Sequence, residues 1–152
     1  MGNEPCEEAP WVYDFAGAPA HTQEVVRRIQ SELFTGRPNG LPGNDDAGAL
    51  SSWYVFSALG LYPEIPGVAG FVVGSPLFPE ATIHLENGSA IRILGKGASS
   101  ARPYVQSLEL DGRAYESPWI SWSALAHGAA LNFNLGDRPS SWGKNQTPRN
   151  SF

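Results

Sequence analysis

The residues best suited to chemistry form a short polar run, Asn44, Asp45 and Asp46. Glycines flank this run, and an apolar stretch of helical type follows it directly. Because a helix N-terminus favours negative charge, carboxylates here are expected to stay ionised. An ionised carboxylate on a rigid turn can activate a water molecule or help to hold a hard cation. The alternative is that Asn and Asp act only as turn and N-cap residues, their common use before a helix.

A second group of oxygen ligands lies near the N-terminus, within residues 3–8. Asn3, Glu4, Glu7 and Glu8 place three carboxylates and one amide there. A calcium site takes about six to eight oxygen ligands, so these side chains are candidates for part of one. The segment has no EF-hand spacing, and a solvated acidic segment is the alternative interpretation.

Other residues of chemical interest give weaker signals. The histidines are scattered without metal-ligand spacing, and the single cysteine, Cys6, excludes an internal disulfide. No nucleophile elbow, phosphate-binding loop or dinucleotide fingerprint occurs. Four tryptophans outside the predicted helices either line a carbohydrate surface or pack between elements: Trp11, Trp119, Trp122 and Trp142.

Composition excludes several classes of function. The length of 152 residues is typical of a single domain. The chain has ten basic and fifteen acidic side chains, which give a formal net charge of −5. This balance argues against a nucleic-acid partner and against a polybasic membrane contact. No apolar stretch is long enough to span a membrane, and no signal peptide is visible.

The elements that must position these residues begin with helices over residues 1–65. Apolar residues recur at helical spacing over residues 23–34, with Thr22 as the expected N-cap and Arg27 on the exposed face. A second helix is predicted over residues 47–59. This helix is apolar almost all round, so one partner helix cannot bury it and further neighbours are expected.

Beyond residue 66 the pattern changes to period-two alternation. Asn87-Gly88 and Asp111-Gly112 each separate two alternating runs, as in β-hairpins, and a further run covers residues 130–135. Short strands at this spacing are typical of an antiparallel sandwich. The sequence therefore predicts an α+β protein, with helices over 1–65, an antiparallel β-sandwich-like region over 66–143 and a flexible tail over 144–152.

Residues 40–63, GLPGNDDAGALSSWYVFSALGLYP, resemble the hallmark segment of the family 92 glycoside hydrolases, the calcium-dependent exo-α-mannosidases. Residues 2–5, Gly-Asn-Glu-Pro, are similar to the Asn-Glu-Pro motif of that family. Residues 74–78 match the family turn that follows the hallmark segment, and Trp142-Gly143 resembles the closing Trp-Gly of the family, so the similarity covers nearly the whole chain.

The resemblance implies an enzyme that removes terminal α-linked mannose from glycans with inversion of configuration. It also implies a Ca²⁺ cofactor, N-glycan processing and a secreted or periplasmic location. This chain resembles the C-terminal portion of such an enzyme: two or three terminal helices of an (α/α)6 barrel and a trailing β region. The family's general acid lies upstream of the Asn-Glu-Pro motif, so the missing N-terminal part of the enzyme is an expected partner.

The same resemblance assigns roles to the two polar segments. Asp46 matches the general base of inverting chemistry, with Asp45 beside it in the catalytic group. Sugar contacts are assigned to Asn44, Glu4 and Asn3, and calcium ligation to Glu4 and Glu7. The alternative is a non-catalytic β-rich carbohydrate-binding or accessory module, which has no need of a carboxylate run at a helix start.

Overall fold

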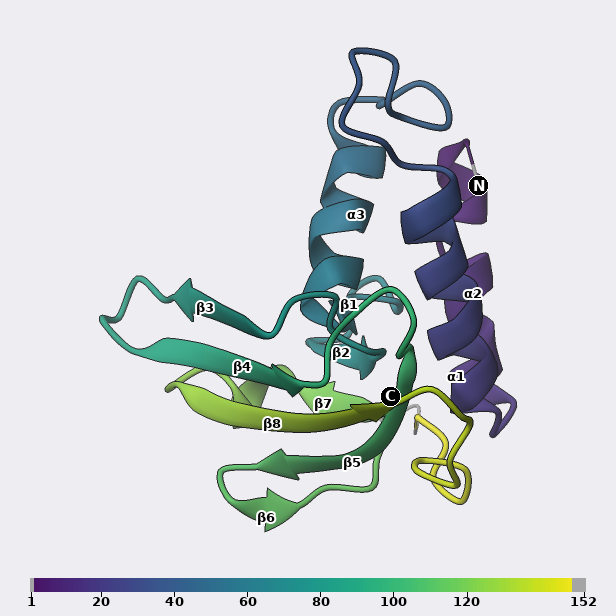
Figure 1. Cartoon of the computed structure of the whole chain (residues 1–152). Coiled ribbons are helices and arrows are strands. Elements are labelled where there is room, and N and C mark those ends of the chain that lie inside the picture. The colour runs from purple at the N-terminus through teal and green to yellow at the C-terminus, as the bar shows by residue number, and fades with distance from the viewer. Residues whose placement is uncertain (1, 149–152) are drawn as a thin grey trace.

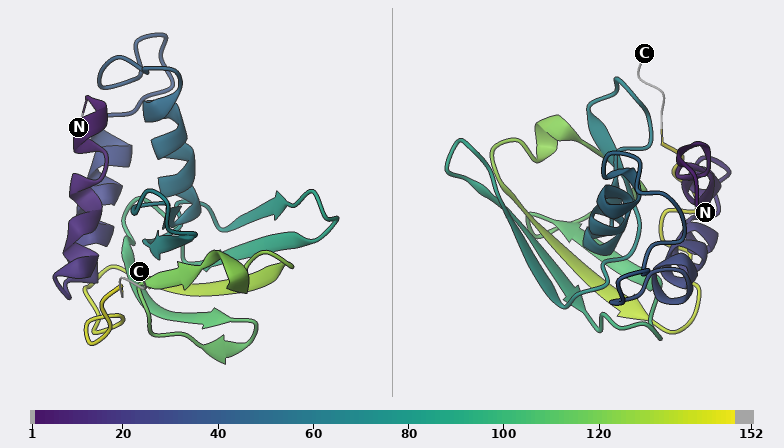
Figure 2. Two further views of the ribbon diagram at one scale, coloured as in Figure 1. Left: turned by 180° about the vertical axis from the view of Figure 1, so that it is seen from behind. Right: turned by 90° about the horizontal axis from the view of Figure 1, so that it is seen from above.

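Helices form the first part of the chain in the computed structural model, which describes residues 2–148 (Figure 1). Two 3-10 turns, η1 (Glu4–Cys6) and η2 (Ala9–Trp11), lead into the single-turn α1 (Val12–Phe15). The longer helices α2 (Pro19–Glu32) and α3 (Ala49–Leu59) stand beside each other on one side of the sheets (Figures 1 and 2).

Helix α2 begins four residues earlier than the apolar pattern predicts. Pro19 occupies the first turn, where the missing N–H of proline has no intrahelical acceptor to lose. The expectation that Thr22 is the N-cap is wrong, because Thr22 lies inside the helix and is fully buried. Helix α3 begins at Ala49 rather than at residue 47, because the two residues before Gly48 have left-handed backbone conformations.

Arg27 is buried, although the helical pattern predicts that it faces solvent. Only 3% of its surface is exposed, and its guanidinium donates to the backbone oxygens of Ser75, Pro76 and Ser99. Burial lowers its pKa to about 10, which still leaves the side chain charged at neutral pH. The prediction was wrong because this face of α2 packs against loops that lie 48 to 72 residues further along the chain.

Within residues 2–148, eight strands form two sheets. The small sheet has the order β1–β2–β7, from β1 (Leu61–Tyr62), β2 (Gly70–Val73) and β7 (Trp119–Ser121). The large sheet has the order β3–β4–β8–β5–β6. Its strands are β3 (Glu80–His84), β4 (Ala90–Lys96), β5 (Tyr104–Leu110), β6 (Arg113–Ala114) and β8 (Ala129–Gly136). A short 3-10 turn, η3 (Trp122–Ala124), follows β7.

Both predicted hairpins are confirmed. β3 and β4 pair antiparallel around Asn87-Gly88. In the second hairpin Leu110 pairs with Arg113, so Asp111-Gly112 forms a two-residue turn in which both residues have positive φ, as type I′ turns require. The pairing of β4 with β8 is parallel, whereas the other strand pairs within residues 2–148 are antiparallel.

Strand β2 joins two hydrophobic cores. Val72 packs with Trp11 and Trp53 in a core beneath the helices, while Val73 packs with Leu131 and other large-sheet residues. Successive strand residues point to opposite faces, so the small sheet lies between the helices and the large sheet. The predicted α+β class, with helices followed by a sandwich-like β region, is therefore confirmed.

The last described residues run along the molecule without forming a helix or strand. Trp142 is buried, and its indole N–H donates to the backbone oxygen of Tyr115. Residues 149–152 of the predicted flexible tail lie outside the described part of the chain. Across residues 2–148, no helix combines the length and the apolar character that crossing a membrane requires.

Candidate active site

The two polar segments singled out in the sequence lie against each other near the start of α3. A side chain on Gly43 would collide with the backbone oxygen of Gly2, so these two backbones touch. The indole N–H of Trp53, on α3, donates to the backbone oxygen of Glu7 at 3.0 Å. Residues more than 40 positions apart are therefore held together by backbone contact and one buried hydrogen bond.

Carboxylates gather at this contact. Glu7 is buried, and burial raises the pKa of its carboxyl group. The negative charges of Glu8, Glu4, Asp45 and Asp46 raise the pKa of Glu7 further, in that order of size. One carboxylate oxygen of Glu7, Oε1, is buried without a hydrogen-bond partner within residues 2–148.

Asp45 fixes the start of α3. Its Oδ1 accepts from the backbone N–H of Ser51 at 2.8 Å, and its Oδ2 accepts from the Ser51 hydroxyl at 2.9 Å. Its backbone oxygen accepts from the N–H groups of Gly48 and Ala49. Both carboxylate oxygens are therefore engaged in capping the helix.

Asp46 lies on a turn of unusual backbone conformation. Asp46, Ala47 and Gly48 have φ values of +44°, +62° and +93°, three left-handed residues in a row. The left-handed region costs a non-glycine residue about 1–3 kcal/mol, and such strain concentrates at functional sites. Asp46 is exposed, and its carboxylate has no hydrogen-bond or ion-pair partner within the described residues. The turn thus presents one free carboxylate to solvent beside a second carboxylate that is fixed.

The other predicted site residues belong to the same two polar segments. Asn44, Asn3 and Glu4 are exposed. The Asn3 side chain accepts from the backbone N–H of Glu4 at 3.1 Å, which holds the first turn of η1. The structure thus brings both predicted segments to one place; Asn3, Glu4, Asn44 and Asp46 are exposed there, whereas Glu7 is buried.

Two positioning residues, Ser51 and Trp53, were not identified from the sequence. Ser51 holds Asp45, and Trp53 holds the backbone at Glu7. A serine in the first turn after an Asp-rich run was the available signal for Ser51. Nothing local distinguishes Trp53 from an ordinary core residue, which it also is.

The described residues do not by themselves form a metal site. Within residues 2–148, no group of three or more His, Cys, Asp or Glu side chains is arranged to hold a metal ion. Calcium takes about six to eight oxygen ligands. The unpartnered Oε1 of Glu7, surrounded by other carboxylates, is a donor suited to a hard cation. The chemistry of this donor set fits calcium, provided that other oxygens come from outside this chain.

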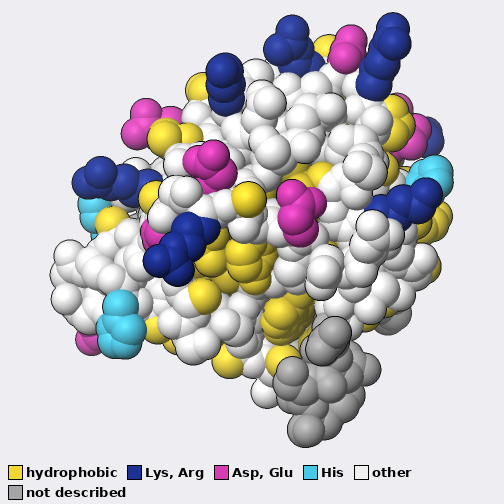
Figure 3. All heavy atoms as spheres, turned by 90° about the horizontal axis from the view of Figure 1, so that it is seen from below, with side chains coloured by type: hydrophobic (Ala, Val, Ile, Leu, Met, Phe, Trp, Pro, Cys, Tyr) yellow, Lys and Arg dark blue, Asp and Glu magenta, His cyan; other side chains and the backbone are white. Residues whose placement is uncertain are grey.

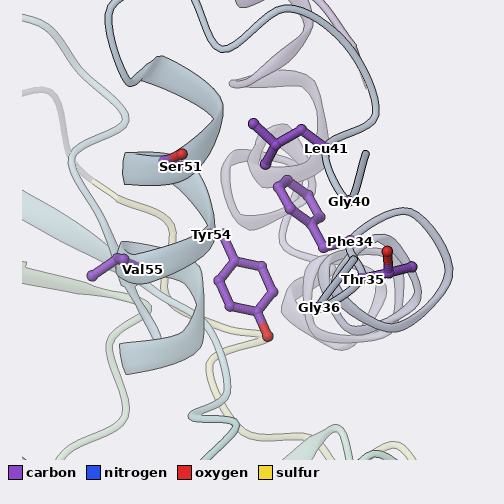
Figure 4. A pocket seen from close by; sticks show the side chains of 8 residues that line it. All are labelled: Phe34, Thr35, Gly36, Gly40, Leu41, Ser51, Tyr54 and Val55. Atoms are coloured by element: carbon purple, nitrogen blue, oxygen red, sulfur yellow. The ribbon is translucent and has the colours of Figure 1, made fainter. Parts of the chain in front are cut away.

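A pocket of about 400 Å³ lies between α3 and the loop that follows α2 (Figure 4). Its walls come from α3 and from the loop that follows α2, and they are mostly apolar. The rings of Phe34 and Tyr54 lie 5.0 Å apart, and Leu41 of the loop lies next to the Phe34 ring. Ser51, which holds Asp45, lies at the edge of this pocket. The lining residues are Phe34, Thr35, Gly36, Gly40, Leu41, Ser51, Tyr54 and Val55.

Two buried acids lie deeper in the helical half. Burial raises the pKa of Glu64 to about 8, and the charge of Glu8 adds to the effect. Burial also raises the pKa of Asp14 well above its usual range; the Thr22 hydroxyl opposes that rise and the charge of Glu64 adds to it. These acids carry no sequence motif, so only their burial in the fold reveals them.

The fold and the sequence together identify the chain as part of the catalytic domain of a glycoside hydrolase. The chain belongs to glycosyl hydrolase family 92, whose catalytic-domain family model matches residues 1–137. An uncharacterized secreted glycosidase from the fungus Arthroderma benhamiae is 33% identical over 149 residues, covering 96% of this chain.

Two solved structures from Bacteroides thetaiotaomicron are similar in fold and sequence. The family GH92 α-mannosidase BT3965 superposes with a TM-score of 0.89 at 30% identity, over 92% of this chain. The family GH92 inverting mannosidase BT2199 superposes with a TM-score of 0.91 at 32% identity, over 97% of this chain. The match covers 19% of BT3965, 20% of BT2199 and 19% of the fungal relative, so this chain spans about a fifth of their length.

Proposed function

We propose that this chain supplies the general-base side of the active site of an inverting, exo-acting α-mannosidase. Family membership and the two mannosidase neighbours support this proposal. The observation that carries it is the strained turn that presents the free carboxylate of Asp46 next to the fixed carboxylate of Asp45. A binding or accessory module, the alternative, has no use for such a turn.

In the proposed reaction Asp46 takes a proton from a water molecule whose oxygen attacks the anomeric carbon of the terminal mannose. The glycosidic bond breaks on the opposite face, and a general acid protonates the leaving oxygen. Inverting enzymes separate these two carboxyl groups by about 6.5–9.5 Å to leave room for the water. The acid comes from the part of the enzyme outside this chain, so the chain alone is expected to be inactive.

The remaining polar residues position the sugar. Asn44, Asn3 and Glu4 are exposed, and their side-chain oxygens and amides can bind mannose hydroxyl groups. Glu4 and Glu7 would contribute oxygen ligands to Ca²⁺, which when bound would polarise and hold sugar hydroxyls. The fungal relative is described as secreted, and we propose the same location for the enzyme that contains this chain.

The stereochemistry of the product tests this proposal. The complete enzyme is mixed with an α-mannoside, and proton NMR follows the anomeric signal of the mannose released first. The expected product is β-mannose, which then mutarotates. A chelator is expected to abolish release, and added Ca²⁺ is expected to restore it. Release of α-mannose, or no release of mannose at all in saturating Ca²⁺, contradicts the proposal.

A further inference from the structure

A surface hollow of about 440 Å³ lies on the β region, away from the strained turn. One side comes from the connection between β3 and β4, and the other comes from η3 and the residues after it. In Figure 1 the β3–β4 connection is at the left, while the loop that precedes α3 is at the top. The lining residues are Leu85, Glu86, Asn87, Trp122 and Ala126.

The indole of Trp122 forms an exposed aromatic wall of this hollow. Trp122 is 39% exposed, whereas Trp11 and Trp142 are buried. Phe71 packs edge-on against the indole, with ring centroids 6.4 Å apart and planes at 68°. The backbone of Trp122 donates to Ala69 and accepts from Ala126, at 3.0 and 2.8 Å. The ring is therefore fixed from behind while much of it faces solvent.

Asn87 braces the two sides of the hollow against each other. Its side-chain amide donates to the backbone oxygen of Ala126, 39 residues further along the chain, at 2.8 Å. Its side-chain oxygen accepts from the backbone N–H and the hydroxyl of Ser89. The hollow is thus formed before any ligand arrives, which lowers the ordering cost of binding.

The hollow contains two polar side chains, the amide of Asn87 and the carboxylate of Glu86. Glu86 is exposed, and within residues 2–148 it has no ion-pair or side-chain hydrogen-bond partner. Among the residues that the structure describes, no cationic side chain lines the hollow, which disfavours an anionic ligand. A purely apolar ligand would strip water from the Glu86 carboxylate without replacing its hydrogen bonds. A neutral ligand ring that has a C–H face and hydroxyl groups suits both sides of the hollow. Its C–H face can pack against the indole, and its hydroxyl groups can donate hydrogen bonds to the carboxylate.

We propose that Trp122 and Glu86 form a second sugar-binding site, for one pyranose unit of a neutral glycan, separate from the catalytic turn. The indole stacks against the apolar face of the sugar ring, and the Glu86 carboxylate accepts hydrogen bonds from two ring hydroxyls. This site does not depend on the proposed mannosidase activity, because it uses no residue of the strained turn.

Saturation-transfer NMR with the 152-residue chain tests the site, with methyl α-mannopyranoside and a mannotriose as probes and a chelator present. Trp122→Ala is expected to weaken binding about tenfold, the loss typical of a central aromatic contact. Glu86→Ala is expected to weaken it severalfold. Phe78→Ala, an exposed aromatic outside the hollow, and Asp46→Asn are expected to leave the affinity unchanged.

Three results overturn the proposal: no saturable binding by the parent chain, unchanged affinity in both hollow variants, or loss of binding in Asp46→Asn alone. The last result would assign the sugar to the catalytic turn. Melting curves check that the Trp122→Ala variant is folded. If that variant does not fold, unchanged sugar affinity in Glu86→Ala is sufficient to reject the site. Mannose release by the complete enzyme is measured separately, so either proposal can fail without the other.

Discussion

Asp45 and Asp46 are adjacent in sequence, yet the backbone gives their carboxylates different surroundings. Both oxygens of Asp45 accept hydrogen bonds from Ser51, while Asp46 is exposed on a left-handed turn. The carboxylate of Asp45 is therefore occupied in holding Ser51, whereas that of Asp46 is free to contact a water molecule. The two residues are therefore expected to respond differently to the same substitution.

Asp46→Asn in the complete enzyme is expected to lower kcat by about 10²–10⁴, the usual contribution of a general base. The change removes the charge but keeps the shape, and Asn tolerates a left-handed backbone better than most residues. The melting temperature is therefore expected to stay close to that of the parent enzyme. Measuring kcat and melting temperature in saturating Ca²⁺ checks both points. A variant that keeps more than about a tenth of the parent kcat, a loss below 1.4 kcal/mol, rules out Asp46 as the base.

Asp45→Asn is expected to lower stability more, and kcat less, than Asp46→Asn does. An amide can accept only one of the two hydrogen bonds from Ser51, so the cap weakens and the free energy of unfolding falls by about 0.5–2 kcal/mol. The loss of kcat is expected to be smaller than for Asp46→Asn. Urea unfolding and steady-state kinetics measure the two effects, with Ser51→Ala as the matched control that removes one hydroxyl bond. Equal losses of kcat in both Asp variants, with stability unchanged, would contradict this division of roles.

At the scale of elements, Arg27 holds α2 to the β region. Replacing Arg27 by Met leaves the backbone oxygens of Ser75, Pro76 and Ser99 without their donor, two of them in buried surroundings. The free energy of unfolding is expected to fall by about 2–4 kcal/mol, since each buried group left unpaired costs about 1–3 kcal/mol.

Arg28→Met is the matched control for Arg27→Met. Arg28 is one position away on the same helix, and its exposed ion pair with Glu32 is expected to contribute less than about 0.5 kcal/mol. Chemical denaturation of both variants measures the difference. Equal stability losses would show that the Arg27 contacts do not hold the two halves together.

Glu64 makes the stability of the helical half depend on pH. Burial raises its pKa from 4.5 to about 8, so between these pH values the folded chain binds more protons than the unfolded chain. The contribution of Glu64 is therefore most favourable below pH 4.5 and is lost as pH rises through about 8. Glu64→Gln is expected to raise the melting temperature near pH 8 and to change it little near pH 4.

Melting curves of Glu64→Gln at several pH values give this comparison. Glu80→Gln, at an exposed strand position, is the control. A difference between Glu64→Gln and the parent chain that stays constant from pH 4 to pH 8 would contradict a buried, proton-holding Glu64.

Local signals predicted some elements and could not predict others. Asp111-Gly112 specifies its own turn, because a two-residue hairpin needs positive φ at both positions. The parallel pairing of β4 with β8 follows from packing between distant segments and has no local signal. Burial of Arg27 likewise depends on loops far along the chain. At the site, the resemblance indicated both polar segments, but the left-handed run at Asp46 and the bonds from Ser51 appear only in the fold.

At the scale of the whole molecule, the exposed apolar surface is uneven. The face in Figure 3 carries scattered side chains of both charges with apolar patches between them. On the helical side, Val55 of α3 is 57% exposed and Leu41 of the neighbouring loop is 38% exposed, both beside the 400 Å³ pocket. One side of helix α3 is thus left exposed. The chain spans about a fifth of its relatives' length, so most of the residues of such an enzyme lie outside it. We expect the rest of the enzyme to cover this side.

The isolated 152-residue chain is expected to self-associate through this side of α3. Large exposed apolar patches on soluble proteins tend to bind other surfaces, and nothing else is present to cover this one. Sedimentation velocity at increasing concentration should show growth beyond the monomer. Val55→Lys, at the most exposed apolar position, is expected to reduce it, whereas Leu94→Lys, at an exposed position on β4, is the control and should not. A monomer at every concentration for the parent chain, or equal effects of the two substitutions, would show that the exposed side of α3 does not drive association.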